Sequence, residues 1–153
     1  MAAERASVTI QPLTLADRAE WEQLWAGYLE FYQHELTDEQ TELTYSRFLA
    51  DETPMWGAIA RDDNGRAVGF THWLTHGSTW SRDGYVYLED LYVSLDVRGG
   101  GVGRALIESV ADWARARGLE KVYWQTQYSN EAGRRLYDKL AKNDYIVYEY
   151  DLI

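Results

Sequence analysis

A strand–helix–strand unit between residues 85 and 127 constrains the possible folds more than any other feature of the sequence. A long strand is predicted over residues 85–93, and a helix over residues 102–117 carries one apolar stripe and ends at Gly118. A further strand is predicted over residues 121–126. Two strands joined through a helix lie parallel in one sheet, with a right-handed connection. The rest of the fold must therefore be built around this pair.

The segments before this unit predict antiparallel strands, and Asn64-Gly65 marks the clearest hairpin turn because both residues tolerate positive φ. The other predicted elements are strands over residues 8–10, 56–61, 67–76 and 145–152, helices over 15–32, from 37 or 38 to 49, and over 130–141, and a turn-rich segment over 77–84. This order predicts an α/β (α+β) fold, with a mixed, mostly antiparallel central sheet and helices on both faces.

Length and composition agree with a single globular domain over residues 1–153. Apolar residues make up 46% and charged residues 26%, an ordinary globular mixture. The absence of cysteine excludes a disulfide scaffold, a cysteine nucleophile and a thiolate metal site. No apolar stretch approaches the roughly 18 residues of a membrane span, and the N-terminus does not resemble a signal peptide, so we expect a cytoplasmic protein.

The net charge of −10 makes nucleic acid or an anionic membrane an unfavourable partner, whereas a cationic substrate fits. Many soluble enzymes are equally acidic, so the charge alone does not decide the function. The 12 tyrosines and 7 tryptophans are compatible with an aromatic core or with a pocket for an amine.

Glycines are concentrated between the first strand and the helix of the crossover, at Gly99, Gly100, Gly101 and Gly103. Glycine lets the main chain approach a ligand closely, and the N–H groups of a helix N-terminus favour an anion. Arg98 and Arg104 add local positive charge. A dinucleotide fingerprint fails because Leu106 stands at its third glycine, and a Walker loop fails because Arg104 stands at its lysine. The loop predicts another phosphate-bearing ligand, or it is only a flexible connection.

Three segments in the same order carry a family resemblance. Arg98-Gly-Gly-Gly-Val-Gly103 resembles the Q/R-x-x-G-x-G/A signature of the GNAT N-acetyltransferase superfamily, which binds the pyrophosphate of acetyl-CoA. Leu88-Glu-Asp-Leu-Tyr-Val93 resembles the family strand that meets the thioester, and the segment from Asn130 to Tyr137 resembles a later family helix. Within the superfamily, the residues of these segments most resemble those of the spermidine/spermine and diamine acetyltransferases and of the yeast histone and polyamine acetyltransferases. The resemblance covers nearly the whole chain and implies a splayed parallel strand pair.

The resemblance implies acetyl-CoA as the cosubstrate. It implies that the main chain of Leu91 and Val93 contacts the pantetheine arm, with the Val93 N–H polarising the acetyl carbonyl. The other residues it assigns to the cosubstrate are Tyr92, Arg98, Gly99, Gly100, Gly101, Val102, Gly103, Arg104, Asn130 and Arg134.

The resemblance also implies two catalytic residues. Tyr137 is assigned to protonating the departing sulfur, and a phenol with a pKa of about 10 still carries its proton at neutral pH. Glu89 matches the acidic position proposed as the base, and it could instead anchor a cationic substrate. Because neighbouring side chains of a strand face opposite sides, only one of Glu89 and Asp90 should enter the cleft directly. We expect Asp90 to be a structural partner or a group that acts through a residue of the site.

The first two helices form the acceptor wall in proteins of this family, and the resemblance places Tyr28 and Tyr32 there as substrate contacts. Trp21, Trp25 and Tyr28 recur at helical spacing, which is more often typical of a buried core than of a ligand site. His72 and His76 fall in a predicted strand, and no HExxH motif is present, so we expect no metal site.

The sequence therefore predicts an N-acetyltransferase that transfers an acetyl group to a primary amine of a small, polyamine-like or diamine-like cation. Acetylation of protein lysines, including histone tails, is one alternative, and a non-catalytic acyl-CoA-binding regulatory module is another. The resemblance further implies a homodimer, with the strand at residues 145–152 or its neighbours at the interface.

Overall fold

The computed structural model describes residues 7–153, which divide into two compact units, the first ending at Tyr123 and the second comprising Trp124–Ile153. The first unit contains a five-stranded sheet with the spatial order β1-β2-β3-β4-β5. Its strands are β1 (Thr9–Pro12), β2 (Met55–Arg61), β3 (Ala67–Ser78), β4 (Ser81–Val93) and β5 (Val122–Tyr123). The first four strands are antiparallel, and β5 is parallel to β4. This confirms the predicted mixed, mostly antiparallel sheet.

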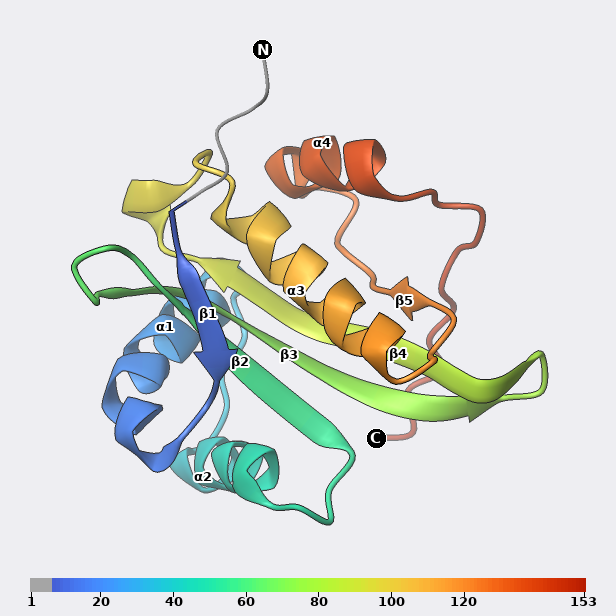
Figure 1. Cartoon of the computed structure of the whole chain (residues 1–153), viewed down its shortest axis with the longest axis horizontal. Coiled ribbons are helices and arrows are strands. Elements are labelled where there is room, and N and C mark those ends of the chain that lie inside the picture. Colours follow the sequence, from blue (N-terminus) through green and yellow to red (C-terminus); the bar gives the residue numbers. More distant parts are fainter. Residues whose placement is uncertain (1–6) are drawn as a thin grey trace. The chain divides into compact units, whose positions relative to one another are not determined.

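Helices cover both faces of this sheet (Figure 1). α3 (Val102–Ala116) lies on one face, and α1 (Arg18–Phe31) and α2 (Asp38–Leu49) lie on the other. Short 3-10 turns precede α1 and α3, at η1 (Leu15–Asp17) and η2 (Leu95–Val97). The second unit contains α4 (Glu131–Leu140), one residue shorter at each end than the predicted helix.

Local polar contacts explain where these elements begin. Thr37 caps α2 by accepting a hydrogen bond from the Gln40 N–H, at 3.1 Å. In the β2–β3 hairpin, the Asp62 carboxylate accepts from the main chain of Asn64 and Arg66, and Gly65 takes the positive φ of 81° that the turn needs.

The predicted turn-rich segment at residues 77–84 is wrong for most of its length. β3 continues to Ser78 and β4 begins at Ser81, so only a two-residue turn separates the strands. Gly84 lies inside β4. Its φ is +94°, and a Cβ there would lie 2.2 Å from the His76 carbonyl oxygen, so this position of the strand requires glycine. The glycine that suggested a loop instead permits a close approach of two paired strands.

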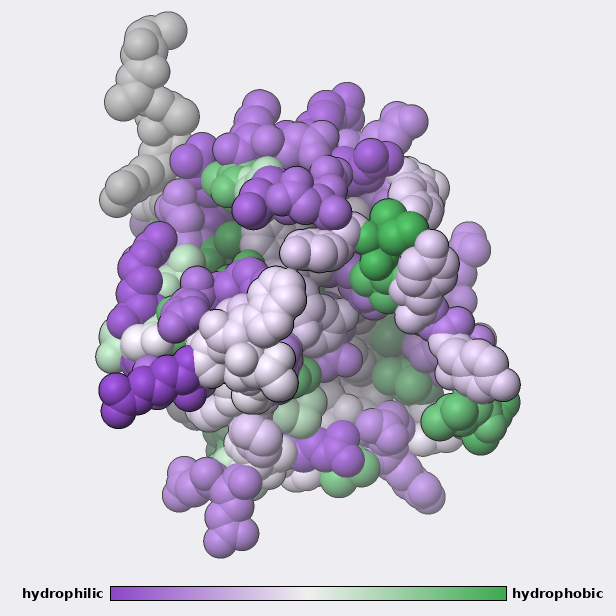
Figure 2. Space-filling view, turned by 90° about the vertical axis from the view of Figure 1, so that its right-hand side faces the viewer, coloured by the Kyte–Doolittle hydropathy of each residue, from purple (hydrophilic) through white to green (hydrophobic). Residues whose placement is uncertain are grey.

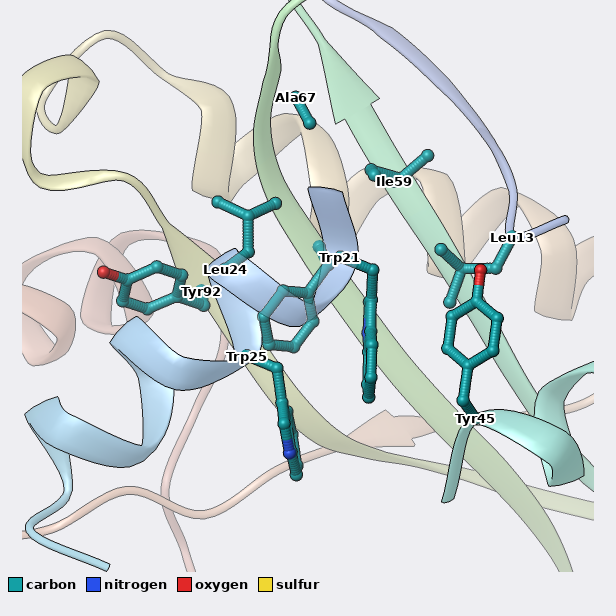
Figure 3. Close-up of a cluster of buried hydrophobic side chains, with 9 residues drawn as sticks. Leu13, Trp21, Leu24, Trp25, Tyr45, Ile59, Ala67 and Tyr92 are labelled. Carbon is teal, nitrogen blue, oxygen red and sulfur yellow. The ribbon is translucent and has the colours of Figure 1, made fainter. Parts of the chain in front are cut away.

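An aromatic core fills the space between the sheet and α1 with α2 (Figure 3). The Trp21 and Trp25 rings stack with centroids 5.4 Å apart, and Tyr45 of α2 packs against Trp21 at 4.7 Å. Both tryptophans are buried, so the structure assigns them to the core rather than to a pocket. On the other face, α3 contributes Val102 and Leu106 to a smaller aliphatic core.

The predicted strand at residues 145–152 is wrong, because residues 141–153 form neither helix nor strand. Alternating tyrosine and β-branched residues favour an extended chain, but a strand exists only where another strand supplies ladder hydrogen bonds. The sheet of the first unit ends at β5, and the sequence pattern could not show whether this segment had a partner in the chain.

The face drawn in Figure 2 is covered mostly by hydrophilic side chains and side chains of intermediate hydropathy, and strongly hydrophobic residues form small separate patches. Such a surface agrees with the net charge of −10. Within residues 7–153, no helix has the length and apolar character needed to span a bilayer.

Candidate functional site

The turn into α3 has the features of an anion-binding site. Gly99 and Gly101 adopt φ values of +86° and +87°, which residues with a Cβ resist. Ala105 donates its N–H to the Gly101 carbonyl at 3.0 Å. The N–H groups of the residues before Ala105 belong to the first turn of the helix, where no earlier turn supplies a carbonyl to accept them. The first turn of α3 contains no acidic residue. A diphosphate therefore fits here on both main-chain geometry and charge.

The two arginines of the loop already have protein partners. The Arg98 guanidinium lies over the rings of Phe31 and Tyr92, at 4.9 and 5.5 Å, and its Nε donates to the Val93 carbonyl at 3.0 Å. The Arg104 Nε donates to Glu108 at 3.0 Å, one turn further along α3. Arg98 thus connects the glycine loop with the C-terminal end of α1.

β4 has an open edge beyond the short β5. The β4–β5 pairing comprises Val86 with Val122 and Tyr87 with Tyr123, whereas β3 pairs with β4 as far as Val93. The Ser94 N–H donates to the Val68 carbonyl of β3, and N–H groups alternate in direction along a strand. The main-chain groups of Val93 and Leu91 therefore point towards the open edge. This is the splayed arrangement expected for contact with a pantetheine arm.

A β-bulge lies at Glu89. His72 pairs with Asp90 and the next residue, Trp73, pairs with Leu88, so Glu89 is the extra residue. Trp73 contacts Trp113 of α3, which places Leu88 on the α3 face. The charge of Glu89 acts on the Tyr28 hydroxyl of α1, which places Glu89 towards the α1 face.

Asp90 lies on that same α1 face, because it accepts a hydrogen bond from Tyr28 of α1. The expectation that Glu89 and Asp90 face opposite sides is therefore wrong. The inserted residue, which the sequence pattern does not reveal, reverses the alternation.

Asp90 is held by groups from two other elements. The Tyr28 hydroxyl donates to its Oδ1 at 2.5 Å, and the Nδ1 of His72 bonds its Oδ2 at 2.9 Å. Trp21 donates its Nε1–H to the Nε2 of the same imidazole at 2.9 Å. Hydrogen bonds from α1 and β3 thus hold the Asp90 carboxylate in place, and the parts of His72 and Trp21 in this arrangement were not recognised from the sequence. Isolated aromatic residues in a strand and a helix give no signal of such a chain of hydrogen bonds.

Burial and the adjacent negative charge of Asp90 raise the pKa of the Glu89 carboxyl above its ordinary value. Burial, followed by the charge of Asp90 and the hydrogen bond to it, also raises the pKa of Tyr28. Tyr28 therefore keeps its proton and remains a hydrogen-bond donor. The raised pKa of Glu89, by contrast, lies closer to neutral pH than the pKa of an ordinary carboxyl group, which suits a base.

The remaining aromatic residues assigned to ligands fall into two groups. Tyr32 lies next to Tyr28, with ring centroids 4.9 Å apart, at the C-terminal end of α1. Tyr92 is buried in the aromatic core, pairs with Phe70 of β3, and lies edge-on to Tyr28 at 6.4 Å. The structure therefore gives the Tyr92 ring a packing role.

In the second unit, the side chain of Asn130 caps α4. Its Oδ1 accepts from the Gly133 N–H at 3.2 Å, and its Nδ2 donates to the Thr126 hydroxyl at 3.0 Å. Arg134 donates to the Tyr128 carbonyl at 3.0 Å. The Tyr137 ring lies edge-on to Trp124, with centroids 5.5 Å apart. Asn130 and Arg134 therefore order the segment that carries Tyr137.

Across residues 7–153, no three histidine or acidic side chains gather closely enough to bind a metal ion. His72 lies on β3, as predicted, and both of its ring nitrogens are engaged by Trp21 and Asp90.

Comparison with known proteins identifies relatives over most of the chain. The model of the acetyltransferase (GNAT) family matches residues 20–141. A D-amino-acid N-acetyltransferase of Saccharomyces cerevisiae is 36% identical over 144 residues, which cover 93% of this chain and 89% of that protein. A type 1 aminoglycoside N(6')-acetyltransferase of Stenotrophomonas maltophilia is 38% identical, over 74% of this chain and 72% of that protein.

Solved structures agree with these relationships. A ribosomal-protein-alanine N-acetyltransferase from Brucella melitensis biovar Abortus 2308 superposes with a TM-score of 0.79 at 27% identity, over 95% of this chain and 99% of that one. An aminoglycoside acetyltransferase bound to a CoA bisubstrate analogue shares the fold, with a TM-score of 0.76 at 22% identity, over 94% and 97% of the two chains. The glycine turn, the open edge of β4 and these matches together show that the chain belongs to the GNAT family of acetyl-CoA-dependent N-acetyltransferases.

Proposed function

We propose that this enzyme acetylates a primary amine of a small, cationic, polyamine-like or diamine-like acceptor. The observation that carries the proposal is the β4 bulge, which brings Glu89 and Asp90 to the face where Tyr28 lies. Two carboxylates beside an aromatic ring make a favourable environment for an ammonium group. The net charge of −10 favours the approach of such an acceptor.

Acetyl-CoA, when bound, supplies an electrophilic thioester carbonyl. The glycine turn from Gly99 to Gly103 would hold its diphosphate, and the Val93 N–H at the open edge of β4 would polarise the carbonyl. The raised pKa of Glu89 lets this carboxylate take the proton that the acceptor ammonium must lose before its nitrogen can attack. Tyr137 would give its phenolic proton to the CoA sulfur as the thioester C–S bond breaks.

A free D-amino acid is a second candidate acceptor, because the Saccharomyces cerevisiae relative of that name is 36% identical over 93% of this chain. Such an acceptor carries a carboxylate next to its amine. Glu89 and Asp90 would repel that carboxylate, so their position favours the acceptor without one.

An acceptor panel separates these possibilities. Spermidine, putrescine, aminoglycosides, D-amino acids and lysine peptides are offered with acetyl-CoA, and the release of free CoA thiol is measured. We expect the highest kcat/KM for spermidine or putrescine. A preference for D-amino acids would contradict the proposed cationic acceptor, and a preference for lysine peptides would indicate a protein acetyltransferase. If no amine led to release of CoA, a non-catalytic acyl-CoA-binding module would be favoured.

The role of Tyr137 is tested by Tyr137→Phe, with Tyr128→Phe as the matched control because the Tyr128 side chain is 81% exposed. We expect Tyr137→Phe to lower kcat by about 10²-fold or more, the usual scale of general acid catalysis, with acetyl-CoA affinity nearly unchanged. Equal kcat values for the two variants would remove Tyr137 from the proton transfer.

A further inference from the structure

His72 is the central member of a buried chain of hydrogen bonds that runs from α1 through β3 to β4. Its Nε2 accepts the Trp21 indole N–H, so this nitrogen carries no proton and the imidazole proton is on Nδ1. Nδ1 therefore donates to Asp90 Oδ2, at 2.9 Å. The Tyr28 hydroxyl donates to the other Asp90 oxygen. Trp21 thus selects the tautomer in which His72 can donate to Asp90.

The imidazole is also fixed in position. It is 1% exposed, and it stacks on Phe48 of α2 at 4.2 Å and on Phe70 of β3 at 4.6 Å. A ring held between two aromatic faces, with both nitrogens bonded, cannot reorient without breaking these contacts. A phenylalanine would fill this apolar site without needing any hydrogen bonds, so packing alone gives no reason for a histidine here.

We propose that His72 is a positioning residue for the acceptor: it holds the Asp90 carboxylate beside Glu89 so that the two form the anchor for the acceptor's ammonium group. This inference rests on the proposed acetylation of a cationic amine. His72 acts through Asp90 and does not touch the acceptor. With Tyr28 it supplies one donor to each Asp90 oxygen, which fixes the rotation of the carboxylate and leaves the remaining lone pairs for a third donor.

The test compares His72→Phe with His72→Asn. Phenylalanine keeps the stacked ring and removes the donor to Asp90, whereas asparagine places an N–H₂ group near the former position of Nδ1. Spermidine binding in the presence of CoA and acetyl-CoA binding are measured by calorimetry, and the KM for spermidine and kcat are measured separately.

For His72→Phe we expect spermidine affinity to fall about tenfold or more, the scale of a lost hydrogen bond to a charged group. Acetyl-CoA affinity and kcat should change little. His72→Asn should recover most of the spermidine affinity. Unchanged spermidine binding in His72→Phe, an equal loss in both variants, or no spermidine binding by the wild type would overturn the proposal. Spermidine binding without turnover would instead remove only the proposed acetylation.

A measurement on the wild type tests the same proposal without any variant. The chain has 3 histidines, so long-range ¹H–¹⁵N spectra can assign each ring. His72 should appear as the tautomer protonated at Nδ1, and Trp21→Phe should weaken that preference while keeping an aromatic ring in the core. A wild-type His72 protonated at Nε2 would contradict the chain of hydrogen bonds and overturn the inference.

Discussion

At the scale of single residues, the acceptor side depends on the one extra residue in β4. Without a bulge, strand alternation would place Glu89 and Asp90 on opposite faces, and only one carboxylate could face α1. With the bulge, the two carboxylates share a face, and the negative charge of one acts on the pKa of the other. The charge of Asp90 is one of the two causes that raise the pKa of Glu89, after burial.

Asp90→Asn should therefore lower the pKa of Glu89, because the amide removes the adjacent charge while the burial remains. A base must be deprotonated to act, so activity is lost as the pH falls through the pKa of Glu89. The acidic limb of the kcat/KM profile should move to lower pH in Asp90→Asn, even though the maximum falls. Asp112→Asn, an exposed carboxylate on α3, should leave the limb in place. An unmoved limb in Asp90→Asn would show that Glu89 is not the titrating base.

At the scale of elements, the two termini of α3 both need glycine but serve different purposes. Gly101 precedes the helix with a φ of +87°, and Gly118 follows it with a φ of +71°. Either site disfavours a side chain, and only the first lies where the helix N–H groups can receive a diphosphate.

Gly101→Val and Gly118→Val should each lose roughly 1–2 kcal/mol of unfolding free energy, the usual cost of a left-handed conformation. Only Gly101→Val should also weaken acetyl-CoA binding, which calorimetry can measure. Equal acetyl-CoA affinity in the two variants would contradict the assignment of the glycine turn to the diphosphate.

The start of α4 is stabilised by the side chain of Asn130, which caps the helix. Asn130→Ala removes the acceptor for the Gly133 N–H and should cost about 1 kcal/mol of helix stability. Asn130→Asp keeps an acceptor and should keep the stability. Thermal unfolding measures both effects. If the two variants are equally stable, the cap contributes nothing, whereas lower acetyl-CoA affinity in a stable Asn130→Asp variant would indicate direct contact with the cosubstrate.

At the scale of the whole molecule, an ion-pair cluster connects β2 with the start of α1. Arg61 donates to Asp17 at 2.7 Å and to Glu20 at 2.9 Å. Burial alone would raise the pKa of Asp17, but the hydrogen bonds from Arg61 and Thr14 outweigh it and lower the pKa. Asp17 therefore stabilises the fold above its unfolded pKa of about 3.9, and this stabilisation is lost as the pH falls through its lower folded pKa.

Asp17→Asn should lower the free energy of unfolding at pH 7 by about 1–3 kcal/mol, as expected for lost hydrogen bonds to a charged group. The difference from the wild type should shrink as the pH falls through the folded pKa of Asp17, because the wild-type carboxylate then takes up a proton. Urea unfolding across this range measures it. Asp96→Asn breaks a fully exposed pair with Arg66 and should have a much smaller effect. A difference that does not depend on pH would exclude the charge of Asp17 as its cause.

The sequence by itself determined the features that depend on local physical chemistry. The apolar stripe of α3, the glycines before it and the Asn64-Gly65 turn act over a few residues, and they were sufficient to predict the crossover, the hairpin and a loop suited to a phosphate-bearing ligand. The motif resemblance added the family, because its three segments stand in the right order along the chain.

The tertiary structure alone decided which side chains meet across strands and helices. The bulge at Glu89 depends on the register between β3 and β4, and the chain from Trp21 through His72 to Asp90 joins residues 51 and 18 positions apart. The unpaired segment at residues 145–152 has the composition of a strand but no partner in the sheet. Pairing and packing are contacts between distant parts of the chain, so no local pattern could report them.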